Sequence, residues 1–254
     1  MPDYGREIYD QTGAAALMLL LKGQPMQQKR TLLLSYLQLG IDLYGIACAI
    51  RDSAKKKGFE GLQARRQHKL SCWPGGAGHH NGRKWPVLFA GMMLGNQDMI
   101  DITKDDSPVA WSEDDQTFII DSVRTKLGYP VATGEGEWGV NHFLDGDDDD
   151  GRWEASAVNE EAKGLPGQTE HKRTNQGLKY RRCCTTNAGW GTVLAAAAFP
   201  GAREAWGHEP YFLYQRRYRK VEGAKGAGDF LAWRRYVGDW QLKMFDRHSE
   251  AHNV

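Results

Sequence analysis

Residues 75–86, GGAGHHNGRKWP, place glycines beside side chains that exchange protons or bind a carboxylate. His79 can act as an acid or a base because an unperturbed imidazole titrates near neutral pH. Arg83 and Lys84 can neutralise a carboxylate, and a guanidinium can hold it through two parallel hydrogen bonds. Since glycine lets the backbone approach a ligand closely, this loop predicts either a binding site or a polar turn before a helix.

A second candidate segment is YRRCCTTNAGW, residues 180–190. Tyr180 can donate or accept a proton, because a cationic neighbour such as Arg181 favours the phenolate. Asn187 adds an amide that can donate to an oxygen. Thr185 or Thr186 is also a good helix N-cap, so a purely structural role for this segment stays open.

The third candidate is GEGEWGVNHF, residues 134–143. Glu137, Trp138 and His142 would combine a carboxylate, a ring that can stack on a sugar, and an imidazole on one loop. A solvated loop with one buried tryptophan is the structural alternative. A glycoside hydrolase would need two carboxylates roughly 5 to 10 Å apart, and the candidates would be Glu135, Glu137, Asp115 and Asp145.

Metal and cofactor motifs are absent from the sequence. The acidic run DGDDDD, residues 145–150, lacks the spacing of an EF-hand loop. The four cysteines include no CxxC pair, and neither a dinucleotide fingerprint nor a phosphate-binding loop occurs. The sequence therefore predicts a protein without a metal or cofactor.

Composition narrows the class of protein further. A chain of 254 residues with 41% apolar residues is long enough for one globular domain. The net charge of +1 argues against a nucleic-acid binder. The most apolar window, residues 32–50, contains Gln38 and Asp42, so no membrane span is expected. The charged N-terminus leaves localisation open: secreted or periplasmic if a signal peptide has been removed, and otherwise cytoplasmic.

Hydrophobic periodicity predicts a mainly helical domain in three parts, 6–96, 97–184 and 185–248. The first part should hold helices over 6–22, 26–52 and 84–94. The helix over 26–52 is apolar on nearly every face, which predicts an inner helix covered on several sides. The middle part should be irregular, with a short strand at 116–123. Helices should resume at 185 and continue over 202–221 and 228–245.

Five blocks resemble a group of helical-toroid proteins found among bacterial carbohydrate-active sequences. They are REIYDQTGAAALMLLL, YLQLGIDLYG, GRKWP with the following FAG, YRRCCTTNAGWGT and AWGHEPYFLYQRRY. The resemblance implies an α/α toroid of helical hairpins with a substrate groove at one end. Fewer hairpins are visible than a complete toroid has, so we expect an incomplete toroid with long irregular loops.

Polysaccharide lyases and glycoside hydrolases both use this architecture. In such lyases a His or Tyr removes the proton next to a uronate carboxylate, Asn and Arg neutralise that carboxylate, and a Tyr protonates the leaving oxygen. Matching residue types here give the catalytic candidates His79, Tyr180, Arg83 and Asn187. The substrate-binding candidates are Lys84, Trp138, His142, Arg181 and Glu137.

The function expected from this resemblance is β-elimination on a uronate-containing polysaccharide. A glycoside hydrolase and a non-catalytic carbohydrate-binding protein are the alternatives. The expected partner is the acidic polysaccharide, without nucleic acid or membrane. Association of several copies of the chain stays open.

Overall fold

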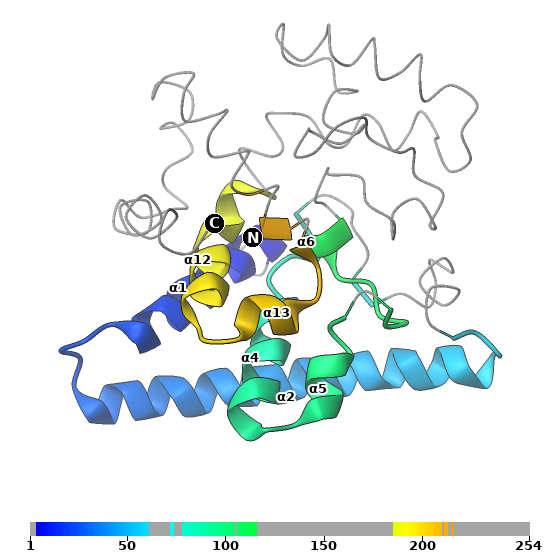
Figure 1. Cartoon of the computed structure of the whole chain (residues 1–254), viewed down its shortest axis with the longest axis horizontal. Coiled ribbons are helices and arrows are strands. Elements are labelled where there is room, and N and C mark those ends of the chain that lie inside the picture. Colours follow the sequence, from blue (N-terminus) through cyan, green and yellow to red (C-terminus); the bar gives the residue numbers. More distant parts are fainter. Residues whose placement is uncertain are drawn as a thin grey trace, which may run out of the picture.

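The computed structural model describes residues 4–60, 72–73, 78–104, 106–115, 185–209, 211–212 and 215. Its elements are α1 (Gly5–Leu20), α2 (Met26–Lys56), α4 (Lys84–Leu94), α5 (Gln97–Asp101), α6 (Ser112–Asp115), the 3-10 turn η1 (Asn187–Gly189), α12 (Trp190–Ala198) and α13 (Ala202–Trp206). In Figure 1, α2 runs along the lower part of the described helices, α4 and α5 lie across it, and α1, α6, α12 and α13 lie above it. The described residues contain no strand, and an isolated bridge joins Trp73 to Trp111. The prediction of a mainly helical protein is confirmed.

The three N-terminal helices lie where periodicity places them. The helix predicted over 84–94 has the bounds of α4, and it ends because Gly95 adopts a left-handed conformation with φ 63°. α1 ends at Leu20, shortly before the predicted end. α2 continues to Lys56, since neither glycine nor proline occurs between the predicted end at residue 52 and Gly58, whose φ is 75°.

The middle part begins with more structure than the sequence predicts. Residues 97–115 contain two short helices, α5 and α6, where an irregular segment was expected. α5 begins because the Asn96 side chain accepts a hydrogen bond from the Met99 N–H at 3.1 Å. The strand predicted at 116–123 lies outside the described residues.

The helix predicted over 202–221 is interrupted. α13 ends at Trp206, and Gly207 takes φ 71°, a conformation that a continuing helix does not allow. Helical backbone returns at Glu209, so Tyr211 and Phe212 belong to a separate turn of the chain. The helix predicted over 228–245 lies outside the described residues.

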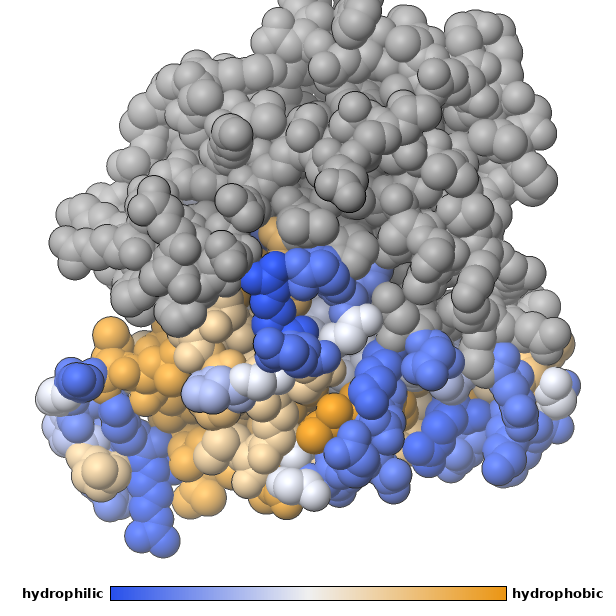
Figure 2. Space-filling model, viewed as in Figure 1, coloured by the Kyte–Doolittle hydropathy of each residue, from blue (hydrophilic) through white to orange (hydrophobic). Residues whose placement is uncertain are grey.

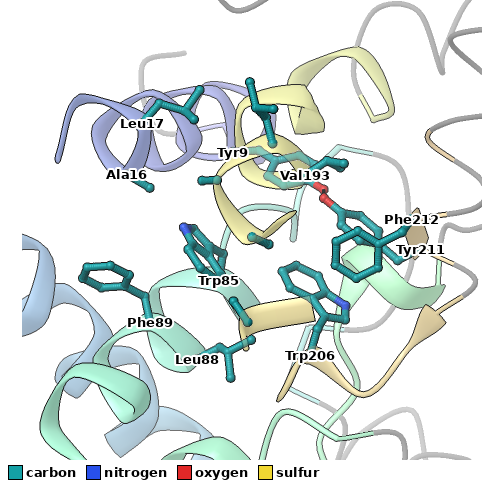
Figure 3. Packing of buried hydrophobic residues seen from close by; sticks show 14 of the residues in the cluster. Tyr9, Ala16, Leu17, Trp85, Leu88, Phe89, Val193, Trp206, Tyr211 and Phe212 are labelled. Carbon is teal, nitrogen blue, oxygen red and sulfur yellow. Dashed lines mark hydrogen bonds between the residues drawn. The ribbon is translucent and has the colours of Figure 1, made fainter. Parts of the chain in front are cut away.

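The main core lies between α1, α4 and α12 (Figure 3), with tryptophan, tyrosine and leucine side chains at its centre. Gly13 allows α1 to lie against α12, because a Cβ atom there would be 2.5 Å from the Thr192 backbone nitrogen. Gly40 likewise allows α2 to cross α4, since its Cβ would be 2.3 Å from the Pro86 carbonyl oxygen. These close crossings bring α1 against α12 and α2 against α4.

The expectation that α2 is an inner helix is wrong. Its buried residues are Tyr36, Gly40, Ala47 and Ala54, which lie on one face. Large apolar side chains on other faces reach solvent. Because the sequence alone is apolar around the whole helix, it could not show which face would find a partner. By length and composition alone, α2 meets the requirements for a membrane span, within the part of the chain that is described.

The described helices share one continuous apolar interior, since Leu37 packs against both of its larger clusters. The toroidal arrangement of hairpins and the division into three parts stay predictions.

Candidate functional site

A small pocket lies where α1, the loop before α4, α6 and the segment before η1 meet. It is lined by Tyr9, Asn81, Glu113, Thr185, Thr186, Tyr211 and Gln215. The centre of a water-sized sphere can occupy about 10 Å³ inside this pocket. This volume is at the lower limit for holding one water molecule. The glycine loop and the segment that begins at Tyr180 therefore both contribute residues to one place.

Glu113 holds the glycine loop in position. Its Oε1 accepts hydrogen bonds from the backbone N–H groups of Gly82 at 2.8 Å, Arg83 at 2.8 Å and Lys84 at 3.1 Å. Arg83 is the N-cap of α4 and makes no side-chain cap. A carboxylate at a helix N-terminus satisfies N–H groups that lack helical partners and interacts favourably with the helix dipole. Glu113 thus caps α4 from a distant part of the chain.

The second oxygen of the same carboxyl lines the pocket. Glu113 Oε2 is buried and has no hydrogen-bond partner among the described residues. Burial raises the pKa of Glu113 above its usual value of 4.5, and the neighbouring Asp114 adds to this, while the backbone N–H donors act in the opposite direction. The pocket therefore contains a carboxyl oxygen that can exchange a proton or accept a hydrogen bond.

Glu113→Gln should change how stability depends on pH. The pKa of Glu113 is higher in the folded state than in the unfolded state. Its contribution to the free energy of unfolding is therefore fully present below about pH 4.5 and is lost as pH rises through the folded-state pKa. The glutamine does not titrate, and its oxygen still accepts from the loop. We expect the variant to gain stability relative to wild type as pH rises, measured by urea unfolding across this range.

Asp101→Asn is the matched control for that experiment. Hydrogen bonds from Lys104 and Gln97 lower the pKa of Asp101. The contribution of Asp101 to wild-type stability is therefore lost as pH falls, whereas that of Glu113 is lost as pH rises. A difference between Glu113→Gln and wild type that is constant with pH would contradict the assignment.

Two tyrosines from opposite ends of the chain meet at the pocket. The hydroxyl groups of Tyr9 and Tyr211 form a hydrogen bond in the interior (Figure 3). Burial is the main reason that the pKa of each lies well above 10. Both are therefore protonated at neutral pH, so this pair can donate hydrogen bonds or a proton but is a poor base.

A buried ion pair positions Tyr211. Lys84 Nζ lies 2.5 Å from Asp114 Oδ2, and both side chains are excluded from solvent. Asp114 Oδ1 accepts a hydrogen bond from Trp206 Nε1 at 2.8 Å. The Trp206 ring stacks on the Tyr211 ring with centroids 4.5 Å apart and 6° between planes. The first residue of α4 thereby helps to fix a pocket tyrosine.

The glycines of the loop make room for the chain's own helix. Gly82 has φ 86°, and a Cβ there would lie 2.6 Å from the Tyr9 Cα. A Cβ on Gly5 would lie 2.0 Å from the Gly78 carbonyl oxygen. Close backbone approach, which the sequence suggested for a ligand, is used in these places to pack the loop against α1.

Four of the predicted site residues are described. His79 is exposed, and the edge of its ring meets Tyr4 at 4.9 Å between centroids. Arg83 is partly buried and donates from Nη1 to the Asn81 carbonyl; burial lowers its pKa, and Glu113 partly offsets this. Asn187 is buried in η1. Lys84 is buried in its ion pair, so its ammonium is not at the surface to meet a substrate.

The other predicted site residues are Tyr180, Arg181, Trp138, His142 and Glu137, and they lie outside the described residues. Sequence reasoning missed Tyr9, Glu113 and Gln215, and it considered Tyr211 as mostly a core or surface residue. No local pattern marks the first three, because the pocket forms from segments that are far apart in the sequence. In the sequence these residues share a polar side chain beside apolar residues of a helix. This pattern is frequent elsewhere in the chain, so it does not identify a site.

The described residues contain no group of three His, Cys, Asp or Glu side chains that could hold a metal ion. Searches of protein-family models, curated proteins and solved structures find no match to this chain.

Proposed function

We propose that this protein is a polysaccharide lyase that cleaves a uronate-containing polysaccharide by β-elimination. One observation carries the proposal: Asn81 of the glycine loop and Thr185 and Thr186 of the second candidate segment line the same pocket. Two segments that are far apart in the sequence, and that were selected for their chemistry, are neighbours in space. The proposal includes an incomplete α/α toroid with the substrate groove at this end of the helices.

The reaction needs a base, a neutralised carboxylate and a proton for the leaving oxygen. The base removes the hydrogen next to the carboxylate, and the C–H electron pair forms a carbon–carbon double bond. The glycosidic C–O bond breaks, and the leaving oxygen takes a proton. Removal of that hydrogen is difficult unless positive or hydrogen-bonding groups stabilise the carboxylate.

The two candidate segments supply a residue for each role in this proposal. His79 is exposed and can be reached by a polymer, so we assign it as the base. Arg83 would neutralise the carboxylate. Tyr180 and Asn187 keep the roles that the resemblance implies, as proton donor and amide. We leave Lys84 out of the substrate contacts because its charge is already paired in the interior.

The size of the pocket sets where a sugar would bind. A space that admits one water molecule excludes a sugar ring. In this proposal the polysaccharide lies outside the pocket, along the exposed side of the loop that carries His79. Glu113 then holds the loop in position through three of its backbone N–H groups.

The test is ultraviolet absorbance of purified protein offered a panel of uronate polysaccharides, because the new double bond is conjugated to the carboxylate. We expect absorbance to rise, and His79→Ala to reduce the rate by about 10²- to 10⁴-fold, the range for loss of a general base. His80→Ala is the matched control, since it changes the adjacent imidazole on the same loop.

New reducing ends without absorbance would instead indicate a hydrolase and direct attention to Glu135 and Glu137. Binding without either product would indicate a non-catalytic carbohydrate-binding protein. A normal rate in His79→Ala would reject His79 as the base, even if the protein proves to be a lyase.

A further inference from the structure

Two buried oxygen atoms at the pocket have no hydrogen-bond partner among the described residues. They are Glu113 Oε2 and Gln215 Oε1, and each residue is only 3% exposed. Figure 2 shows many hydrophilic residues, in blue, at the surface, where bulk water can solvate them. Glu113 and Gln215 instead line the same small pocket. Since a buried acceptor without a hydrogen bond is costly, the two oxygens indicate a bound ligand that donates to both.

The tyrosine pair adds a donor to these two acceptors. The hydroxyl groups of Tyr9 and Tyr211 point toward one another (Figure 3) and form a hydrogen bond. Each hydroxyl carries one proton and can also accept a hydrogen bond. One hydroxyl therefore donates to the other, and the accepting hydroxyl keeps its own proton for a further partner. The pocket thus presents two acceptors and one donor to a ligand.

The remaining residues that line the pocket have partners within the chain. Asn81 Oδ1 accepts a hydrogen bond from the Ser112 hydroxyl at 2.7 Å. The hydroxyl oxygens of Thr185 and Thr186 lie 3.5 Å apart, so one can donate to the other. These residues shape the space, and the unmet hydrogen bonding comes from the carboxyl, the amide and the tyrosine pair.

A water molecule matches this pocket in size and in hydrogen bonding. The centre of a water-sized sphere can occupy about 10 Å³ there, which is enough for one water and for nothing larger. Water can donate twice and accept from the tyrosine pair, which gives the three hydrogen bonds that are usual for a buried water. A monovalent cation could bind the two oxygens, but it has no lone pair to accept the tyrosine proton.

We propose that the pocket binds one water molecule, which donates to Glu113 Oε2 and to Gln215 Oε1 and accepts from the Tyr9–Tyr211 pair. Glu113 Oε1 holds the glycine loop through three backbone N–H groups. The water therefore connects that loop, through the Glu113 carboxyl, to α1 and to residue 215. It is a structural ligand that joins segments far apart in the sequence.

The experiment is oxygen-17 magnetic relaxation dispersion of the solvent, which counts water molecules that stay inside a protein for longer than the protein takes to rotate. Thr185→Ile replaces a hydroxyl by an ethyl group at the pocket, which fills a space of the size of one water. We expect the dispersion amplitude to fall by that of one water molecule. Thr185→Val is the matched control, because it keeps the shape of threonine and should retain the full amplitude.

Gln215→Met tests the same water through stability, and it also covers the case that Thr185→Ile does not fold. Methionine has a similar length but no amide acceptor. If the water donates to Gln215, the variant loses a hydrogen bond, so we expect a lower melting temperature. If Gln215 Oε1 is buried without any partner, the variant removes a penalty and the melting temperature should rise. Gln38→Met, at an exposed glutamine of α2, is the control and should change it little.

Equal dispersion amplitudes in the wild type and a folded Thr185→Ile would overturn the proposal, as would a higher melting temperature in Gln215→Met. A cation would be the ligand instead if potassium or sodium chloride raised the wild-type melting temperature above its value in choline chloride, and if Glu113→Gln abolished that difference. None of these outcomes depends on whether the chain is a lyase.

Discussion

Lys84→Met should lower the free energy of unfolding by about 3–5 kcal/mol, because it leaves Asp114 as a buried charge without its cation. Lys84 Nζ and Asp114 Oδ2 are 2.5 Å apart in the interior, and the ammonium also lies 4.7 Å from the centroid of the Trp206 ring. Methionine fills a similar volume, so the loss would come from charge more than from packing. Urea unfolding at neutral pH measures it.

The chain contains a matched control for this change. Lys104 and Asp101 form an ion pair at 2.6 Å, but their side chains are 42% and 50% exposed. Water solvates both charges there, so Lys104→Met should cost no more than about 1 kcal/mol. Equal losses for the two methionine variants would show that burial of the Lys84–Asp114 pair has no energetic consequence.

The double variant K84M/D114N separates the effect of an unpaired Asp114 charge from the effect of replacing the Lys84 side chain. Asparagine has no charge to strand, and its Oδ1 can still accept from Trp206 Nε1, which lies 2.8 Å from the native acceptor. Most of the stability lost in Lys84→Met should therefore return. No recovery would mean that the ammonium itself, through its contact with the tryptophan ring, accounts for the loss.

Gly82→Ala should also be strongly destabilising. Alanine variants of two other glycines separate the cost of a left-handed backbone from the cost of a steric clash. Gly45 has ordinary helical backbone and open space, so alanine there should stabilise the protein by about 0.5–1 kcal/mol. Gly58 has φ 75° and open space, so alanine should cost about 1–2 kcal/mol for the left-handed backbone alone.

Gly82 has both a left-handed backbone and close neighbouring atoms. Its φ is 86°, and a Cβ would lie 2.6 Å from the Tyr9 Cα and N atoms. Because backbone atoms of α1 cannot rotate away, overpacking should add about 1–3 kcal/mol to the cost of the left-handed conformation. Thermal unfolding of the three alanine variants should rank Gly82 below Gly58 and Gly58 below Gly45. Equal melting temperatures for the Gly82 and Gly58 variants would mean that the loop moves away from α1 without cost.

Tyr211 depends on contacts outside the pocket. The Lys84–Asp114 pair holds Trp206, whose ring stacks on Tyr211, and the Tyr211 hydroxyl meets Tyr9. Glu113 separately fixes the loop through three backbone donors. Residues predicted from the sequence to bind substrate, such as Lys84, therefore help to build the site without reaching its surface.

The three N-terminal helices and the position of the polar loop could be predicted from the sequence. Helix formation follows from local periodicity and from residues such as Gly95, so α4 could be predicted to the residue. The glycine content of the loop before α4 also indicated close backbone approach, although the approach that is described is to α1.

Which polar groups meet, and which face of α2 is covered, depends on how the helices pack in three dimensions. Tyr9 and Tyr211 are 202 residues apart, and Asp114 and Trp206 are 92 residues apart. No periodicity connects such pairs, because their contacts depend on how the helices pack. The same is true of α2, which is apolar on nearly every side. Burial of one face depends on α4, and a local pattern cannot indicate a partner that is distant in the sequence.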